Sequence, residues 1–171
     1  METTATKISL ELNLAQIALV VKDIKAAKSF FEDVLGISNF SNVETSRAKD
    51  YEATYFGKPS DAENLVAQAY SGGTFIELIQ PVSGNSMFHD YLDKNPAGGI
   101  QHVAYRIPVA KLDKVISGFA DKGFHVISTF DTSIAKIVFF DTYKEIGVMT
   151  EIMGITEEGE KAIEKMKNGT A

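Results

Sequence analysis

The two halves of the chain repeat one order of sequence patterns, and this repeat limits the possible folds more than any other feature. Residues 16–21 (QIALVV) match residues 102–107 (HVAYRI), and residues 73–79 (GTFIELI) match residues 147–153 (GVMTEIM). Each pair of segments is flanked by the same kind of predicted element. Two matches in the same order indicate an internal duplication in which each half is one structural unit.

The first half is predicted to run strand, helix and then a meander of strands. Residues 15–22 are an apolar run typical of a buried strand, and Asp23 follows at a helix N-cap position. Apolar residues then recur at helical spacing up to Gly36. Four further strands are expected, although one of these segments is compatible with a loop: Ile37–Val43, Tyr51–Phe56, Leu65–Tyr70 and Thr74–Gln80, with Pro81 ending the last.

The second half follows the same plan. Ile100–Ile107 is strand-like, Pro108 is placed for a helix start, and an apolar stripe continues to a stop at Gly123. Three strands are expected after it: Val126–Thr129, Ile134–Phe140 and Val148–Met153. The pattern predicts one domain with module one at 13–82, a linking helix within 83–98, module two at 99–155 and a charged amphipathic C-terminal helix at 156–171.

Composition excludes several classes of function. The length of 171 residues and the 44% of hydrophobic residues suit one globular domain. The absence of cysteine excludes disulfides, thiolate zinc sites and a cysteine nucleophile. A net charge of −6 argues against nucleic-acid binding, which needs clustered Lys and Arg. The opening residues 1–14 carry no targeting signal and no membrane span, so we expect a soluble cytoplasmic protein.

Four polar residues occupy equivalent places in the two halves: Gln16 with His102, and Glu77 with Glu151. In an alternating strand, each projects to the face opposite its neighbours, so the four side chains are expected to converge on a concave sheet surface. One imidazole, two carboxylates and an amide oxygen form a suitable ligand set for a divalent transition metal. Two open coordination positions would then accept a substrate.

Each of these residues also has a structural interpretation. A single Glu in an apolar strand usually faces solvent, and a single His is more often a hydrogen-bonded structural residue than a ligand. The paired positions, rather than any one residue, favour the metal site. His89 and His125 have no equivalent in the other half, so we expect them at the surface and assign them no role.

These residues and their setting resemble the vicinal oxygen chelate superfamily, which includes glyoxalase I, methylmalonyl-CoA epimerase, extradiol dioxygenases and bleomycin-resistance proteins. The resemblance covers about residues 13–155. It implies an α+β fold in which two βαβββ modules form a cupped mixed sheet around a metal ion. It also implies a homodimer with a small-molecule substrate. Zn, Ni, Co and Mn all tolerate such ligands, so each is a candidate for the metal.

The resemblance points to two subfamilies. The order Gln, Glu, His, Glu at positions 16, 77, 102 and 151 looks like the ligand set of glyoxalase I, whereas extradiol dioxygenases use two His and one Glu. The glutathione-binding arginine of glyoxalase I would fall near Val20, which counts against glutathione. The layout of residues 77–81, 88–92 and 98–105 resembles methylmalonyl-CoA epimerases instead. The second catalytic glutamate of epimerases has no clean match at Lys49–Glu52, where Asp50 and Glu52 are the carboxylates available.

We therefore expect a metal-dependent isomerase, epimerase or lactoylglutathione lyase-like enzyme that moves a proton next to a carbonyl. The metal would stabilise the enolate charge, and a carboxylate would take the proton. By resemblance to glyoxalase I, Glu151 is the expected base, with Glu77 on the opposite face of the substrate. Substrates of this chemistry are 2-oxo, hydroxy-carbonyl or acyl-thioester compounds. The alternatives are a non-catalytic binder of the bleomycin-resistance type and, less favoured, a dioxygenase.

Overall fold

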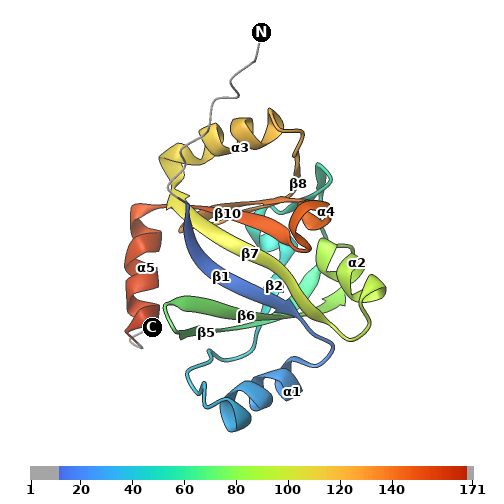
Figure 1. Ribbon diagram of the computed structural model, residues 1–171, viewed down its shortest axis with the longest axis vertical. Helices are drawn as coiled ribbons and strands as arrows, with labels where there is room; N and C mark the ends of the chain where they lie inside the picture. The colour runs from blue at the N-terminus through green and yellow to red at the C-terminus, as the bar shows by residue number, and fades with distance from the viewer. Residues whose placement is uncertain (1–11, 169–171) are drawn as a thin grey trace.

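The computed structural model describes residues 12–168, and the strands of this part of the chain form one mixed sheet in the order β2-β5-β6-β1-β7-β10-β9-β8-β3-β4. The sheet curls into a cup, and β1 and β7 lie side by side at its middle (Figure 1). Residues 1–11 of the opening segment, for which the sequence predicts no targeting signal, lie outside the described residues. So do residues 169–171 of the predicted last helix.

The first half contains these elements: β1 (Asn13–Val20), α1 (Ile24–Ser29), the π-helical turn η1 (Phe30–Val34), β2 (Glu44–Arg47), the 3-10 turn η2 (Ala48–Tyr51), β3 (Thr54–Tyr55), β4 (Lys58–Pro59), β5 (Glu63–Ser71) and β6 (Thr74–Ser83). Helix α2 (Met87–Lys94) links it to the second half, which contains β7 (Gly99–Pro108), the 3-10 turn η3 (Val109–Lys111), α3 (Leu112–Ala120), β8 (Val126–Asp131), β9 (Ala135–Phe140), α4 (Tyr143–Ile146), β10 (Met149–Ile155) and α5 (Glu157–Lys167).

The pairing of strands repeats in the two halves, as the α+β duplication predicts. β1 pairs in parallel with β6, and β7 pairs in parallel with β10. The antiparallel neighbours follow outward on each side, β5 and β2 in one half and β9 and β8 in the other. The antiparallel pair β1 and β7 joins the two halves edge to edge. Each half is therefore a βαβββ unit, and β3–β4 is an extra hairpin that pairs with β8 of the opposite half.

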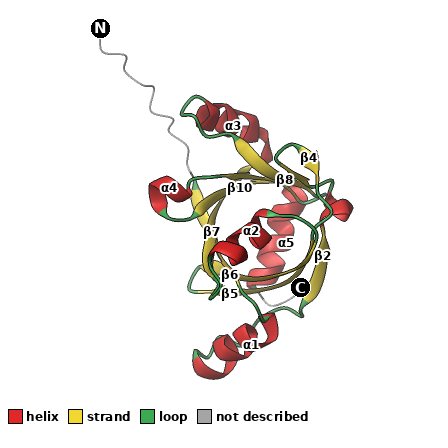
Figure 2. Cartoon of the chain, turned by 90° about the vertical axis from the view of Figure 1, so that its right-hand side faces the viewer, coloured by secondary structure: helices red, strands yellow, loops and turns green. Residues whose placement is uncertain are grey.

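Successive side chains of each strand alternate between the convex face of the sheet, which packs against α1 and α3, and the concave face, which lines the cup. On the convex side, Leu78 packs under α1 in one half and Ile152 packs under α3 in the other. Their chain neighbours Glu77 and Glu151 must then point into the cup, because successive side chains of a strand face opposite ways. Helices α2 and α5 lie at opposite ends of the cup (Figures 1 and 2).

The structure corrects four sequence-based expectations. The segment Ile37–Val43 is not a strand, because it meets β5 through isolated bonds such as Ser41 N–H to the Gln68 carbonyl rather than through a ladder. The segment expected as strand Tyr51–Phe56 is reduced to β3, after a left-handed residue at Glu52. Strand β6 continues through Pro81, which lies beside a register shift of β5 and so loses no regular ladder bond. Helix α3 ends at Ala120, three residues before Gly123.

Gly159 allows α5 to lie directly on the turn before β9. A Cβ atom at this position would overlap the backbone carbonyl oxygen of Ile134, which cannot move without breaking the turn. Alanine ordinarily stabilises a helix by about 1 kcal/mol relative to glycine. Here overpacking, which costs about 1–3 kcal/mol, outweighs that gain. We expect Gly159→Ala to lower the free energy of unfolding and to make α5 sensitive to protease, whereas exposed Lys161→Ala in the same helix leaves both unchanged.

Candidate functional site

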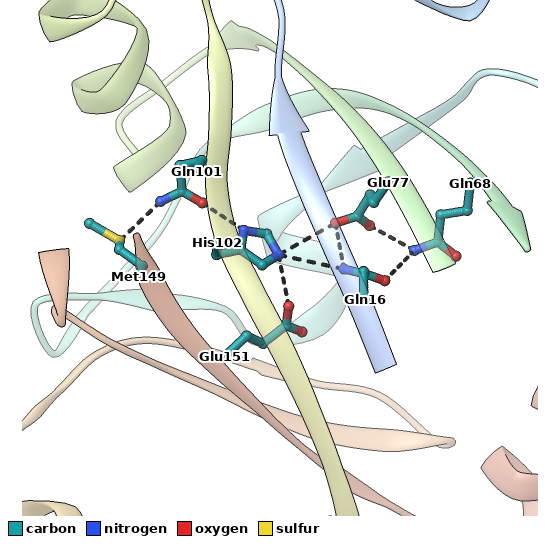
Figure 3. Close-up of polar contacts among 7 residues, drawn as sticks. All are labelled: Gln16, Gln68, Glu77, Gln101, His102, Met149 and Glu151. Atoms are coloured by element: carbon teal, nitrogen blue, oxygen red, sulfur yellow. Dashed lines mark hydrogen bonds and ion pairs between the residues drawn. The ribbon is translucent and has the colours of Figure 1, made fainter. Parts of the chain in front are cut away.

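The four residues singled out by the repeat lie together on the concave face of the sheet (Figure 3): Gln16, Glu77, His102 and Glu151. In the register, Ala18 of β1 has Glu77 as its partner on β6 and His102 as its partner on β7. Two residues away along β1 and β7 is a second row, in which Ala104 of β7 has Gln16 and Glu151 as its partners. The two rows are related by a two-fold axis that exchanges Gln16 with His102 and Glu77 with Glu151.

Small residues make room for this cluster. Ala18 and Ala104 are fully buried at the centre of the two rows. Because their side chains end at Cβ, the longer polar side chains on either side lean over them and meet. Larger side chains at these two positions would fill the space that the cluster occupies.

Two amides hold the carboxylate of Glu77. Gln16 Nε2 donates to Glu77 Oε2 at 2.8 Å, and Gln68 Nε2 of β5 donates to Glu77 Oε1 at 2.7 Å. Gln68 Nε2 also donates to Gln16 Oε1 at 3.3 Å. Both oxygens of Glu77 are therefore occupied by amide donors, and the carboxylate has one orientation.

The position of His102 is set by its neighbour in the chain. A β-bulge between β1 and β7 leaves Gln101 without a partner residue, so that Gln101 and His102 turn into the interior together. Gln101 Oε1 lies 2.6 Å from His102 Nδ1, and Gln101 Nε2 donates to the sulfur of Met149 at 3.0 Å. Because an amide oxygen can only accept, Nδ1 carries a proton, and Nε2 faces the cup, where a neutral ring presents its lone pair.

That lone pair faces a carboxylate. His102 Nε2 lies 2.8 Å from Glu151 Oε2 and 3.7 Å from Glu77 Oε2, and Glu151 Oε2 is buried without a hydrogen-bond partner. A neutral imidazole nitrogen and a carboxylate oxygen at this distance repel unless a positive centre lies between them. Either a proton, which makes the ring an imidazolium, or a metal ion satisfies this requirement.

Aromatic rings close one side of the cluster. Phe139 meets the His102 ring edge to face with 5.1 Å between centroids, and Phe88 of α2 lies at 6.1 Å. Both phenylalanines are buried. Water is therefore kept from this side of His102, which strengthens every charge interaction in the cluster.

Burial raises the pKa of Glu77 to about 7, against the opposing effect of His102, with Glu151 adding to the rise and the Gln68 hydrogen bond reducing it. The folded metal-free protein therefore holds a proton on Glu77 more tightly than the unfolded chain does, so this contribution to stability is complete below pH 4.5 and is lost as the pH rises through about 7. The loss amounts to at most about 3 kcal/mol.

Urea unfolding of the chelator-treated protein measures this effect. We expect the free energy of unfolding to fall between about pH 5 and about pH 8, and the fall to disappear in Glu77→Gln. Equal slopes in the two proteins would assign the pH dependence to other groups.

The nitrogen and oxygen donors of the cluster are of the types that bind divalent metal ions. In this structure, however, several of them are hydrogen-bonded to one another. Within residues 12–168, no three or more His, Asp and Glu side chains form a ready set of metal ligands. The unpartnered Glu151 Oε2 and the inward nitrogen of His102 are donors that lack a cation. Gln16 would bind through Oε1, which now faces Gln68, so its amide would turn when an ion is bound.

The remaining candidates lie elsewhere. Asp50 and Glu52 are exposed in and directly after turn η2 and have no hydrogen bond to the cluster. His125 is exposed, as expected. His89 is half-buried and bonds through Nδ1 to Ser86 Oγ at the start of α2.

Two site residues were missed by sequence reasoning. Gln68 has no equivalent in the second half, and only the pairing of β5 with β6 places it opposite Glu77. Gln101 directly precedes His102 and was expected on the other face of the strand. The bulge that turns it inward has no signal in the sequence.

Comparison with known proteins identifies the family. A family model described as the glyoxalase/bleomycin resistance protein/dioxygenase superfamily matches residues 15–140. The chain belongs to this superfamily. Its curled α+β sheet is the fold of solved members: methylmalonyl-CoA epimerase from Mycobacterium tuberculosis has a TM-score of 0.59 at 20% identity, over 88% of this chain and 91% of that one.

Two curated relatives are similar in sequence. The Bacillus subtilis protein YqjC, described as uncharacterized, is 28% identical over 142 residues, which is 81% of this chain and 89% of YqjC. Ethylmalonyl-CoA/methylmalonyl-CoA epimerase of Cereibacter sphaeroides is 29% identical over 94 residues, which is 55% of this chain and 60% of the epimerase. Superfamily membership and this distant similarity support an epimerase-like or related function. No helix within residues 12–168 is long and apolar enough to cross a membrane.

Proposed function

We propose that this protein is a metal-dependent enzyme that moves a proton at the carbon next to a carbonyl, as an epimerase or isomerase does. The observation that carries the proposal is the buried His102–Glu151 contact, in which a lone pair and an unpartnered carboxylate oxygen meet at 2.8 Å. Gln16, Glu77, His102 and Glu151 would hold the ion, chosen from Zn, Ni, Co and Mn. When bound, it supplies Lewis-acid stabilisation of negative charge on substrate oxygens.

The residues of the chain divide the remaining work. Glu151 is the proposed base, and its carboxylate takes the proton from the substrate carbon. Glu77 approaches from the other half of the duplicated site and can return a proton to the opposite face, which is the exchange that an epimerase needs. Gln68 orients Glu77, and Phe88 with Phe139 exclude water behind His102.

The similarity to methylmalonyl-CoA epimerases supports an acyl-thioester substrate, while 2-oxo and hydroxy-carbonyl compounds share the required chemistry. Solvent-deuterium incorporation tests the proposal. The chelator-treated protein is reloaded with each metal and incubated with methylmalonyl-CoA or with the methylglyoxal–glutathione adduct. We expect exchange into methylmalonyl-CoA. Exchange into the adduct alone would assign a glyoxalase-like enzyme, and no exchange with any metal would reject the proposal.

A second candidate is a binding protein without chemistry, of the bleomycin-resistance type. The observation that favours it is the self-bonded state of the cluster, in which Gln16 and Gln68 already satisfy both oxygens of Glu77. Metal analysis of the purified protein separates the two candidates. A tightly bound or activating divalent ion supports the enzyme, and its absence supports the binder. The homodimer stays a prediction.

A further inference from the structure

Helix α5 closes a cavity of about 260 Å³ against the concave face of the sheet. Its walls are mostly apolar and come from both halves of the sheet and from the helix, including Phe75, Ile137, Met153, Ile163 and Met166. Gln16 and Gln68 of the polar cluster also line it, so the cavity leads to the candidate site. It is smaller than the roughly 300–1,000 Å³ of most sites for drug-sized ligands, which favours a short ligand or one segment of a longer ligand.

The cavity has two chemically different ends. Gln16 pairs with Ala104 on β7, and Arg106 follows two residues later on the same face of that strand. Two residues of a strand span about 7 Å, so Arg106 lies about that far from the Gln16 end. Lys167, in the last turn of α5, lines the cavity together with Arg106. The cavity therefore offers amides at the Gln16 end and an apolar middle. Two cations flank its far side from opposite ends of α5: Arg106 beside Glu160 of the first turn, and Lys167 in the last turn.

The two cations are not neutralised from inside the cavity. Of the described residues that line it, none is acidic. Arg106 Nη1 meets Glu160 at 3.8 Å and Lys167 Nζ meets Glu164 at 2.9 Å, but these glutamates are 52% and 62% exposed and lie on the solvent side of the helix. The cationic side chains are only 26% and 20% exposed. Exposed pairs of this kind are weak, so an anion in the cavity can compete for both cations.

We propose that this cavity binds a small amphipathic anion, with an apolar body along the walls and a carboxylate or phosphate on the far side, between Arg106 and Lys167. The proposal rests on the proposed function only in taking the Gln16 end as the reacting end of the ligand. Helix α5 lies outside the residues 15–140 that match the family model, so the proposal makes Lys167 a specificity-determining residue in a part of the chain beyond that match.

Binding of matched probes tests the proposal. Hexanoate and hexanamide share an apolar body and differ in charge, and their binding to the chelator-treated full chain is followed by calorimetry or NMR titration. We expect hexanoate to bind more tightly, and Lys167→Met and Arg106→Met each to weaken hexanoate about threefold to tenfold without affecting hexanamide. Glu164→Gln, which frees Lys167, should strengthen hexanoate binding. Lys161→Met removes the same charge from the exposed face of α5 and should change neither probe.

Two outcomes would overturn the inference. One is equal binding, or no saturable binding, of the two probes, and the other is an equal effect of Lys161→Met and Lys167→Met. Acetyl-CoA is the third probe. If Arg106→Met and Lys167→Met weaken the binding of acetyl-CoA, the anionic group recognised at the site is a phosphate. If they weaken only the binding of hexanoate, the anionic group is a carboxylate. Because binding is measured without metal or turnover, absence of deuterium exchange would reject the proposed function and leave the anion site standing.

Discussion

Replacement of Glu151 by glutamine is expected to reduce proton exchange by about 10²- to 10⁴-fold, the usual contribution of a general base. Glutamine keeps the length of the side chain and one oxygen donor, but its amide cannot take a proton at neutral pH. Metal content should therefore remain close to that of the unchanged protein. Deuterium incorporation and metal analysis of the same sample measure the two effects.

The matched control is Glu145→Gln, which makes the same change at an exposed position of α4. It should leave exchange and metal content unaltered. Exchange retained in Glu151→Gln would remove Glu151 from the mechanism. Loss of exchange together with loss of metal would make Glu151 a ligand without showing that it is the base, and Glu77 would become the first candidate for proton transfer.

Replacement of His102 by alanine should weaken metal binding by at least about 100-fold and abolish exchange, because the neutral ring is the one nitrogen donor in the predicted ligand set. It should also lower the free energy of unfolding by about 2–5 kcal/mol. The fully buried ring fills the space between Phe88 and Phe139, and its removal leaves a cavity and takes away the partner of Gln101 Oε1.

Two further variants separate these contributions. His102→Gln keeps a polar side chain of similar length, so it should recover part of the stability but little of the metal affinity. His125→Ala removes an exposed histidine and should change neither quantity. Metal titration and urea unfolding provide the measurements. Unchanged metal affinity in His102→Ala would exclude the proposed site.

The proposed anion site on the far side of the cavity acts on substrate binding and not on metal binding. Arg106 and Lys167 lie away from the cluster, so their variants should raise KM and leave metal content unchanged. In contrast, Glu151 and His102 variants act on exchange itself. Kinetic measurements on the two groups of variants therefore distinguish binding of the substrate from its chemistry.

The amino-acid sequence by itself determined the α+β class, the duplicated strand-helix plan and the four polar positions that come together. These properties depend on signals within a few residues: the apolar runs, the Asp23 cap confirmed by its bonds to the Lys25 and Ala26 amides, and the repeated letters around Gln16, Glu77, His102 and Glu151. Alternation then assigns each carboxylate to the face opposite a buried neighbour.

Tertiary structure alone decided which segments form strands in the sheet, which further residues join the site, and where the cavity lies. These features depend on contacts between residues far apart in the chain. The segment Ile37–Val43 has strand-like composition, but it meets β5 only through isolated hydrogen bonds and forms no ladder. Gln68 becomes a site residue only through its register opposite Glu77, and Gln101 only through a bulge against β1. Helix α5 reads in sequence as a charged amphipathic segment, and its apolar face becomes a cavity wall only when the curled sheet brings β1, β5, β9 and β10 around it.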